Sequence, residues 1–152
     1  MNSIAVATFT ARNAMGQALE AECLSAHDGF SARYDMNRLE GTFSRLAHRL
    51  FGQSYRGRIL ALDTAKGGVA SAWMLYEMKS RNLYPAAIIF NTVNPILAQG
   101  AAQAGITMLA GFDVTSHPKF AATPDSDLTL REKLLSCWAK TAGGCRLGGL
   151  CL

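Results

Sequence analysis

The residues best suited to chemistry in this sequence lie between an apolar run and the start of a helical pattern. Residues 63–68 read DTAKGG, and a serine follows at position 71. A helix beginning near Val69 would offer unpaired backbone N–H groups and a partial positive charge at this turn. Paired glycines let a ligand approach the backbone closely, and Lys66 adds a full positive charge. These features favour the binding of a carboxylate or a phosphate.

The same spacing is also typical of a tight strand-to-helix turn with no ligand. Thr64 or Asp63 would then cap the helix, and Ser71 would be a small packing residue instead of a hydroxyl presented to a substrate. The segment has neither the GxxxxGK[ST] pattern of a Walker A loop nor the GxGxxG pattern of a dinucleotide site. Spacing alone favours the plain turn slightly over a binding site.

Two further polar segments are candidates for binding. Residues 29–35 read GFSARYD, where Arg33 can bind a carboxylate with its forked nitrogens or form a surface ion pair with Asp35. Asn94 precedes Pro95, which predicts a helix N-cap beside the end of a strand, where open α/β sheets bind ligands. We expect simple capping there.

Other titratable residues give little sign of a complete catalytic set. The histidines, at positions 27, 48 and 117, lie far apart in loop-like segments, and we expect them to be solvated or interfacial. Four cysteines have no zinc-like spacing, and free thiols are favoured over a disulfide or a metal clip. The sequence contains no close carboxylate pair. Any reaction would therefore need a second chain to complete the site.

The elements that must position these residues alternate between strand and helix patterns. Short strands are expected within 57–63, 86–90 and 106–113, and helices over 69–81 and from Asn94 onward. This alternation predicts parallel strands with right-handed crossovers. Glu77 and Arg81 are spaced for an ion pair one helical turn apart.

The flanking segments are less clearly patterned. Residues 3–9 favour a first strand, whereas residues 18–25 fit a helix or a strand equally well. Residues 41–58 read as an exposed loop anchored by Phe43 and Phe51. Residues 124–140 are compatible with a capped amphipathic helix, and the glycine-rich end that follows has no clear period.

Composition indicates an ordinary globular protein of one domain. Of the 152 residues, 49% are hydrophobic and 17% charged, and the formal net charge is +4. The basic residues are scattered, which argues against a nucleic-acid partner. There is no secretory signal pattern and no apolar run of the roughly 18 residues that span a bilayer. We expect no membrane association and a cytoplasmic location.

From about Gly29 to Asp113 the sequence resembles the swivel domain of the aconitase X family. The shared features are GQ near residue 52, the GR-apolar strand, the glycine-containing turn, PAAIIF and NPILAQGA, in this order and spacing. The resemblance implies an α/β fold, a three-layer swivelling β/β/α domain of the aconitase type over residues 1–120. Residues 121–152 would be a divergent C-terminal tail.

The resemblance also implies a hydro-lyase that removes water from a small hydroxy acid. This chain would be the small subunit, inactive alone, and a large aconitase X-type subunit would hold the iron–sulfur cluster in a heterodimer. The chain itself would bind no metal or cofactor. The first expectation for the substrate is cis-3-hydroxy-L-proline. The alternatives are mevalonate 5-phosphate, or a non-catalytic binding or assembly module of the same fold.

The resemblance assigns roles to the turn. Lys66 and the N–H groups of Gly67 and Gly68 would hold a carboxylate, with Ser31 and Arg33 as further substrate-binding residues. Ser71 or Thr64 would transfer the proton. The family turn typically reads G-R-G-S-S and aligns with residues 65–69, so Gly68 and Val69 stand where the family has serines.

Overall fold

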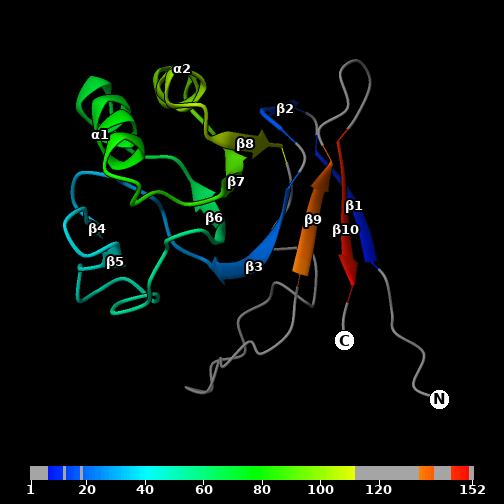
Figure 1. The fold of residues 1–152 in the computed structure, drawn as a ribbon, viewed down its shortest axis with the longest axis horizontal. Coiled ribbons are helices and arrows are strands. Elements are labelled where there is room, and N and C mark those ends of the chain that lie inside the picture. The colour runs from blue at the N-terminus through cyan, green and yellow to red at the C-terminus, as the bar shows by residue number, and fades with distance from the viewer. Residues whose placement is uncertain (1–6, 12, 18, 112–133, 139–144, 151–152) are drawn as a thin grey trace.

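The computed structural model describes residues 7–11, 13–17, 19–111, 134–138 and 145–150 (Figure 1). Its centre is a sheet of parallel strands covered by two helices. The parallel strands, in spatial order, are β3 (Leu19–Ala26), β6 (Ile59–Thr64), β7 (Ala87–Thr92) and β8 (Thr107–Ala110). Strand β2 (Asn13–Met15) pairs antiparallel with β8. Helix α1 (Val69–Ser80) connects β6 to β7, and α2 (Pro95–Ala104) connects β7 to β8, as predicted.

A second group of strands extends this sheet in the antiparallel sense. Strand β9 (Leu134–Trp138) pairs with β3 and with β10 (Cys145–Leu150), and β10 pairs with β1 (Ala7–Ala11). The complete order is β1-β10-β9-β3-β6-β7-β8-β2. Because β1 and β2 are consecutive in the chain but lie at opposite ends of this order, the sheet must fold back on itself (Figure 1).

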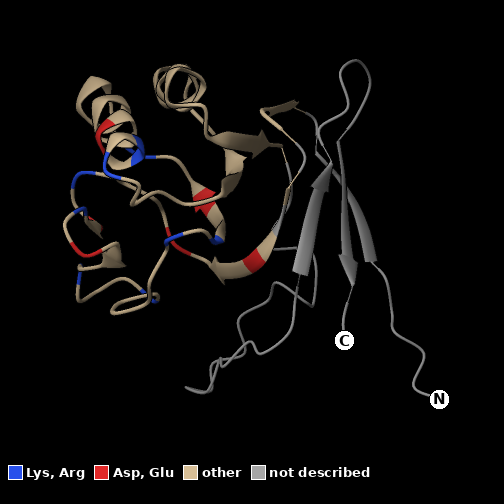
Figure 2. Ribbon diagram, viewed as in Figure 1, with Lys and Arg blue, Asp and Glu red and all other residues tan. Residues whose placement is uncertain are grey.

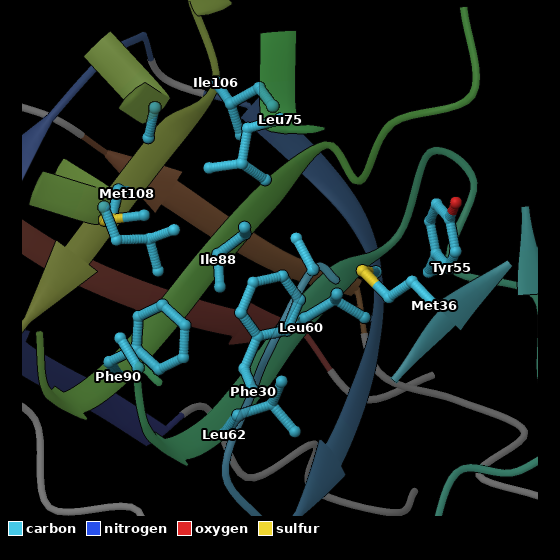
Figure 3. Packing of buried hydrophobic residues seen from close by; sticks show 14 of the residues in the cluster. Phe30, Met36, Tyr55, Leu60, Leu62, Leu75, Ile88, Phe90, Ile106 and Met108 are labelled. Atoms are coloured by element: carbon cyan, nitrogen blue, oxygen red, sulfur yellow. The ribbon is translucent and has the colours of Figure 1, made fainter. Parts of the chain in front are cut away.

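Strands β6, β7 and β8 are buried on both faces over four consecutive residues each. Leu60, Leu62, Ile88 and Phe90 belong to the core on the helix side (Figure 3). The alternate residues of the same strands, such as Ile59 and Ile89, are also fully buried. Coverage of both faces explains why β6 and β7 are continuous apolar runs and do not alternate with polar residues. Burying each such side chain contributes about 1.5–3 kcal/mol relative to leaving it exposed.

The two helices lie in direct contact. A Cβ atom added to Gly100 of α2 would lie only 2.5 Å from the Cβ atom of Ala72 on α1, so glycine allows this close approach. The predicted cap of α2 is confirmed, because the Asn94 side chain accepts a 2.8 Å hydrogen bond from the Leu97 N–H group. The predicted ion pair of Glu77 and Arg81 is present at 3.0 Å.

Residues 27–58 form an irregular lobe beside α1. It contains the short strands β4 (Met36–Asn37) and β5 (Thr42–Phe43), which pair with each other. Phe43 is buried and anchors this lobe as predicted, but Phe51 is 49% exposed and does not. His48 is buried and stacked on Phe43 with ring centroids 4.7 Å apart, so the expectation of a solvated or interfacial histidine is wrong there.

The flanking segments contain strands where the sequence left the conformation open or predicted a helix. The segment that fitted helix and strand equally is strand β3. Within the expected helix over 124–140, residues 134–138 are strand β9 instead, and the remainder lies outside the described residues. The glycine-rich end contains strand β10. The domain boundary at residue 120 stays a prediction. Within the part of the chain described, neither helix is long and apolar enough to cross a membrane.

Candidate functional site

The turn that joins β6 to α1 lies at the carboxyl end of the parallel strands and is held from both sides by backbone hydrogen bonds. On one side, the segment that follows β3 runs beside it. On the other side, β7 supports it through Thr92. The bonds are Asp63 N–H to the Asp28 carbonyl (3.0 Å), Phe30 N–H to Thr64 (2.9 Å), Lys66 N–H to Phe30 (2.7 Å) and Ala65 N–H to Thr92 (3.0 Å).

Gly67 sits directly over two serine hydroxyls. Its φ angle is +114°, and a Cβ atom added there would lie 2.1 Å from the Ser71 Oγ atom and 3.9 Å from the Ser31 Oγ atom. Both serines are buried, with exposed fractions of 2% for Ser71 and 7% for Ser31. The structure therefore brings three candidate residues together, from α1, from the turn and from the segment after β3.

Lys66 and Gly68 form the open side of the turn. The Lys66 side chain crosses Gly29, since a Cβ atom on Gly29 would lie 2.6 Å from Cε and 3.0 Å from Nζ. Lys66 is exposed, and none of the ion pairs among the described residues involves it. A Cβ atom on Gly68 would meet nothing within 4 Å, so there is open space above it. A cation, exposed backbone and open space therefore adjoin one another.

The start of α1 has no side-chain cap. Gly68 is the N-cap residue, and no described side chain bonds to the first turn. The prediction that Thr64 or Asp63 caps the helix is wrong, because Asp63 accepts a 3.2 Å hydrogen bond from the Asn91 side chain instead. The Ser71 and Ala72 N–H groups donate to the Gly68 carbonyl, at 3.0 and 3.2 Å. The N–H groups of Val69 and Ala70, which precede them in the first turn, are left for a ligand or for water. Asn94 supports the turn from α2 by donating a 3.0 Å hydrogen bond to the Gly67 carbonyl.

A buried carboxylate orders the segment that carries Ser31 and Arg33. Asp35 is 1% exposed and accepts a 2.8 Å hydrogen bond from the Ser31 N–H group. Its ion-pair partner is Arg45 at 3.2 Å, so of the two alternatives for Arg33 the surface ion pair with Asp35 is wrong. The Arg33 guanidinium lies 5.4 Å from the centroid of the Tyr34 ring, and both side chains are exposed. Ser31 is thus brought to the turn, whereas Arg33 stacks beside it on Tyr34.

A polar row that the sequence did not reveal crosses three neighbouring strands at their carboxyl ends, with His27 directly after β3 and Asp63 and Asn91 next to last in β6 and β7. His27 Nδ1 lies 3.8 Å from Asp63 Oδ1, which also binds Asn91. The register pairs Ala26 of β3 with Leu62 of β6, and Leu62 with Phe90 of β7. The next residue of each segment is therefore aligned as well, which places His27, Asp63 and Asn91 in one row. That row could have been found only with β3 assigned as a parallel strand. His117 lies outside the described residues.

The described side chains supply a binding surface and no complete reaction centre. Lys66 and the backbone N–H groups can hold an anion, and the Ser71, Ser31 and Thr64 hydroxyls lie in or beside the turn. Within the described ranges, no group of three or more His, Cys, Asp or Glu side chains is placed to hold a metal ion. Lys and Arg residues are spread over the loops around β4 and β5 and beside α1 (Figure 2).

The chain is similar to known proteins of the aconitase X type. The profile of a family described as the aconitase X swivel domain matches residues 8–126. The phosphomevalonate dehydratase small subunit of Thermococcus gammatolerans is 31% identical over 104 residues, which cover 68% of this chain and 79% of that protein. The protein of the same name from Methanosarcina mazei is 27% identical over 122 residues, covering 80% and 83% of the two chains.

Solved structures support the fold. The holo-form crystal structure of Thermococcus kodakaraensis aconitase X superimposes with a TM-score of 0.72 over 96% of this chain and 98% of that chain, at 21% identity. The solution structure of a UPF0107 protein gives a TM-score of 0.63 at 26% identity, covering 77% and 86% of the two chains. The predicted three-layer swivelling β/β/α architecture is confirmed.

Proposed function

The chain belongs to the aconitase X swivel-domain family, and we propose that it is the small subunit of a hydro-lyase whose active site a large subunit completes. Relatives named phosphomevalonate dehydratase small subunits favour mevalonate 5-phosphate as the substrate. They support this alternative better than cis-3-hydroxy-L-proline, which was the first expectation.

The observation that carries the proposal is the open, cationic turn before α1. Mevalonate 5-phosphate has a carboxylate at one end and a phosphate at the other, and both are ligands for a lysine beside free N–H groups at a helix start. Lys66, with the N–H groups of Gly67 and Gly68, would hold one of these anionic ends. Ser31, packed beneath Gly67 with its N–H group fixed by Asp35, would support the turn from below.

Removal of water from a 3-hydroxy acid takes a proton from the carbon beside the carboxylate and hydroxide from the next carbon. Thr64 is exposed at the edge of the turn, whereas the Ser71 hydroxyl is enclosed against Gly67. Thr64 can therefore meet a substrate with the turn as it stands, and Ser71 only if the turn opens. In this proposal either hydroxyl moves a proton with help from groups on the large subunit.

The described part of this chain does not fit an iron–sulfur cluster, because it lacks a group of three metal-binding side chains. We assign the cluster to the large subunit, as the family resemblance implies, where it would supply a Lewis acid for the leaving hydroxyl. This chain's own contribution is to bind the anionic end, to position it and to cover one side of the reaction space. It should accordingly be inactive alone.

The experiment is co-expression with an aconitase X-type large subunit from the same genome. The purified complex should remove one water from mevalonate 5-phosphate, seen by mass spectrometry, while either subunit alone should not. cis-3-Hydroxy-L-proline serves as the competing substrate in the same assay. Turnover of cis-3-hydroxy-L-proline without turnover of mevalonate 5-phosphate would overturn the proposed substrate.

A non-catalytic role is favoured by one feature, the replacement of the two family serines by Gly68 and Val69. Under that alternative the chain would assemble with its partner and position a ligand without reaction. A stable complex that turns over neither substrate, although its cluster is intact by absorption spectroscopy, would support it.

A further inference from the structure

Helix α1 exposes a row of large apolar side chains. Val69, Trp73 and Tyr76 are 61%, 69% and 54% exposed. Their spacing of four and three residues places them on one side of the helix. The opposite side, with Ser71, Leu75 and Met78, is buried. We call Val69, Trp73 and Tyr76 the α1 face.

Packing on both flanks fixes where the α1 face points. Ala72 contacts Gly100 of α2 on one flank. On the other flank, Arg38 binds Glu77, and Ser31 lies beneath Gly67, so residues 31–38 run along the helix. The α1 face is directed away from the core between these two neighbours. Two further exposed apolar residues adjoin these flanks: Tyr34 lies on the segment 31–38, and Ile96 lies in the first turn of α2.

Contiguous apolar surface of this kind is unusual on a protein that works alone. Large exposed patches with a polar border mark interaction sites, and Trp and Tyr are enriched among the residues that dominate binding energy at interfaces. Leaving Trp73 in water forgoes the stabilisation that its burial would give. The sequence pattern includes Trp73 and Tyr76 among the periodic apolar residues of the helix, yet no described part of the chain covers them.

We propose that the α1 face is the docking surface for the large subunit. The inference rests on the proposed function and identifies the surface used. Val69 directly follows Gly68, the residue with open space above it. A chain that completes the site from that side must therefore cover the first turn of α1, and the α1 face continues from that turn along the helix. The binding site and the apolar row form one continuous surface.

The charges around the α1 face indicate the chemistry of its partner. Glu77 is the only carboxylate in α1, and it is already paired with Arg38 and Arg81. Lys66 and Arg33 are exposed near the start of the helix. The border is thus positively charged around an apolar centre. The matching surface on the large subunit should have an apolar groove with an acidic border.

The test compares two double variants in binding to the purified large subunit. Trp73→Ser/Tyr76→Ser changes the α1 face, and Leu39→Ser/Leu46→Ser removes two apolar side chains that are 73% and 83% exposed on the lobe of residues 27–58. We expect Trp73→Ser/Tyr76→Ser to raise the dissociation constant by at least roughly 30-fold, which is the effect of losing one interface hot spot. The second should change it less than about threefold. Circular dichroism should show both variants folded, since all four side chains are exposed.

Binding and turnover are measured separately, so the two proposals can fail independently. Loss of binding in the α1 variant with no turnover by the wild-type complex would support the docking surface and overturn the proposed reaction. Wild-type binding by the α1 variant would overturn the docking surface even if the complex is active. Failure of the wild-type chain to bind the large subunit would also overturn the proposed docking surface. A self-dimer of the wild-type chain that the same substitutions disperse would assign the α1 face to a second copy instead.

Discussion

The Oγ atom of Ser71 occupies the space that a side chain on Gly67 would need. A Cβ atom at position 67 would lie 2.1 Å from it, and the φ angle of +114° is itself strained for any other residue. The turn can therefore close over Ser71 only with glycine at this position. The shape of the turn and the burial of the Ser71 hydroxyl group therefore depend on each other.

Gly67→Ala should lower the free energy of unfolding by about 1–3 kcal/mol, because the added methyl group meets Ser71 and the backbone conformation is unfavourable. Gly68→Ala is the matched control, since φ is −122° there and nothing lies within 4 Å of the added atom. Urea denaturation of the two variants measures the difference. Equal losses would contradict the account of the turn.

Lys66→Ala should reduce kcat/KM of the complex by roughly 10- to 100-fold, because a charge-assisted contact to an anionic substrate is lost. Its thermal stability should not change, since the side chain is exposed. Lys66→Arg should restore part of the activity. Lys79→Ala, which removes a lysine that lies over the Tyr84 ring near the end of α1, is the control. Unchanged kinetics for Lys66→Ala would remove the turn from substrate binding.

Tyr55 should make the protein sensitive to high pH. Burial raises the pKa of its hydroxyl from 10.0 to about 12. Because the folded-state pKa is the higher one, the protonated hydroxyl contributes stability that is complete below pH 10 and is lost as the pH rises towards 12. The loss should reach roughly 2 kcal/mol. Denaturation at several pH values will measure it.

Tyr55→Phe tests this assignment directly. At neutral pH it should be less stable by about 1 kcal/mol, because the hydrogen bond from the hydroxyl to the Asn37 carbonyl is lost. The difference from the wild type should shrink above pH 10 and reverse as the pH approaches 12, since only the wild type loses stability when Tyr55 ionises and phenylalanine cannot ionise. Tyr34→Phe, at an exposed position, is the control. A constant difference between wild type and Tyr55→Phe at all pH values would show that Tyr55 is not the group responsible.

Asp35→Ala should destabilise the protein by about 1–3 kcal/mol, because the buried N–H group of Ser31 would lose its partner. The segment beneath the turn would also lose its tie to Arg45. Glu40→Ala, at an exposed position in the same lobe, should change stability by less than about 0.5 kcal/mol. Thermal unfolding distinguishes the two, and similar behaviour would contradict an ordering role for Asp35.

The central strands and both helices are predictable from the sequence because their signals are local. The apolar run of β6, the cap at Asn94 and the glycines at 67 and 68 each identify an element from its own residues. Strands β9 and β10 are not predictable in this way, because their strand conformation depends on partners far away in the chain. The glycine-rich residues of β10 have little intrinsic preference for a strand.

The residues of the candidate site also differ in whether the local sequence predicts their position. Lys66, Gly67 and Ser71 are close in sequence, so the pattern of the turn identified them together. The placement of Ser31 beneath Gly67 depends on the pairing of the segment after β3 with residues 63–66. The position of His27 beside Asp63 depends on the register of β3 with β6. Both require knowing that β3 is a parallel strand.

The side chain of Asn94 serves two helices at once. Its oxygen accepts from Leu97 in the first turn of α2, and its amide nitrogen donates to the Gly67 carbonyl before α1. An amide side chain can make both contacts because it carries an acceptor oxygen and a donor nitrogen on the same group. A substrate that displaced the turn would therefore also break the hydrogen bond between the turn and the cap residue of α2. The turn proposed to bind the anion is thus tied to α2 by a hydrogen bond that needs no ligand, so binding at the outer side of the turn should need little rearrangement.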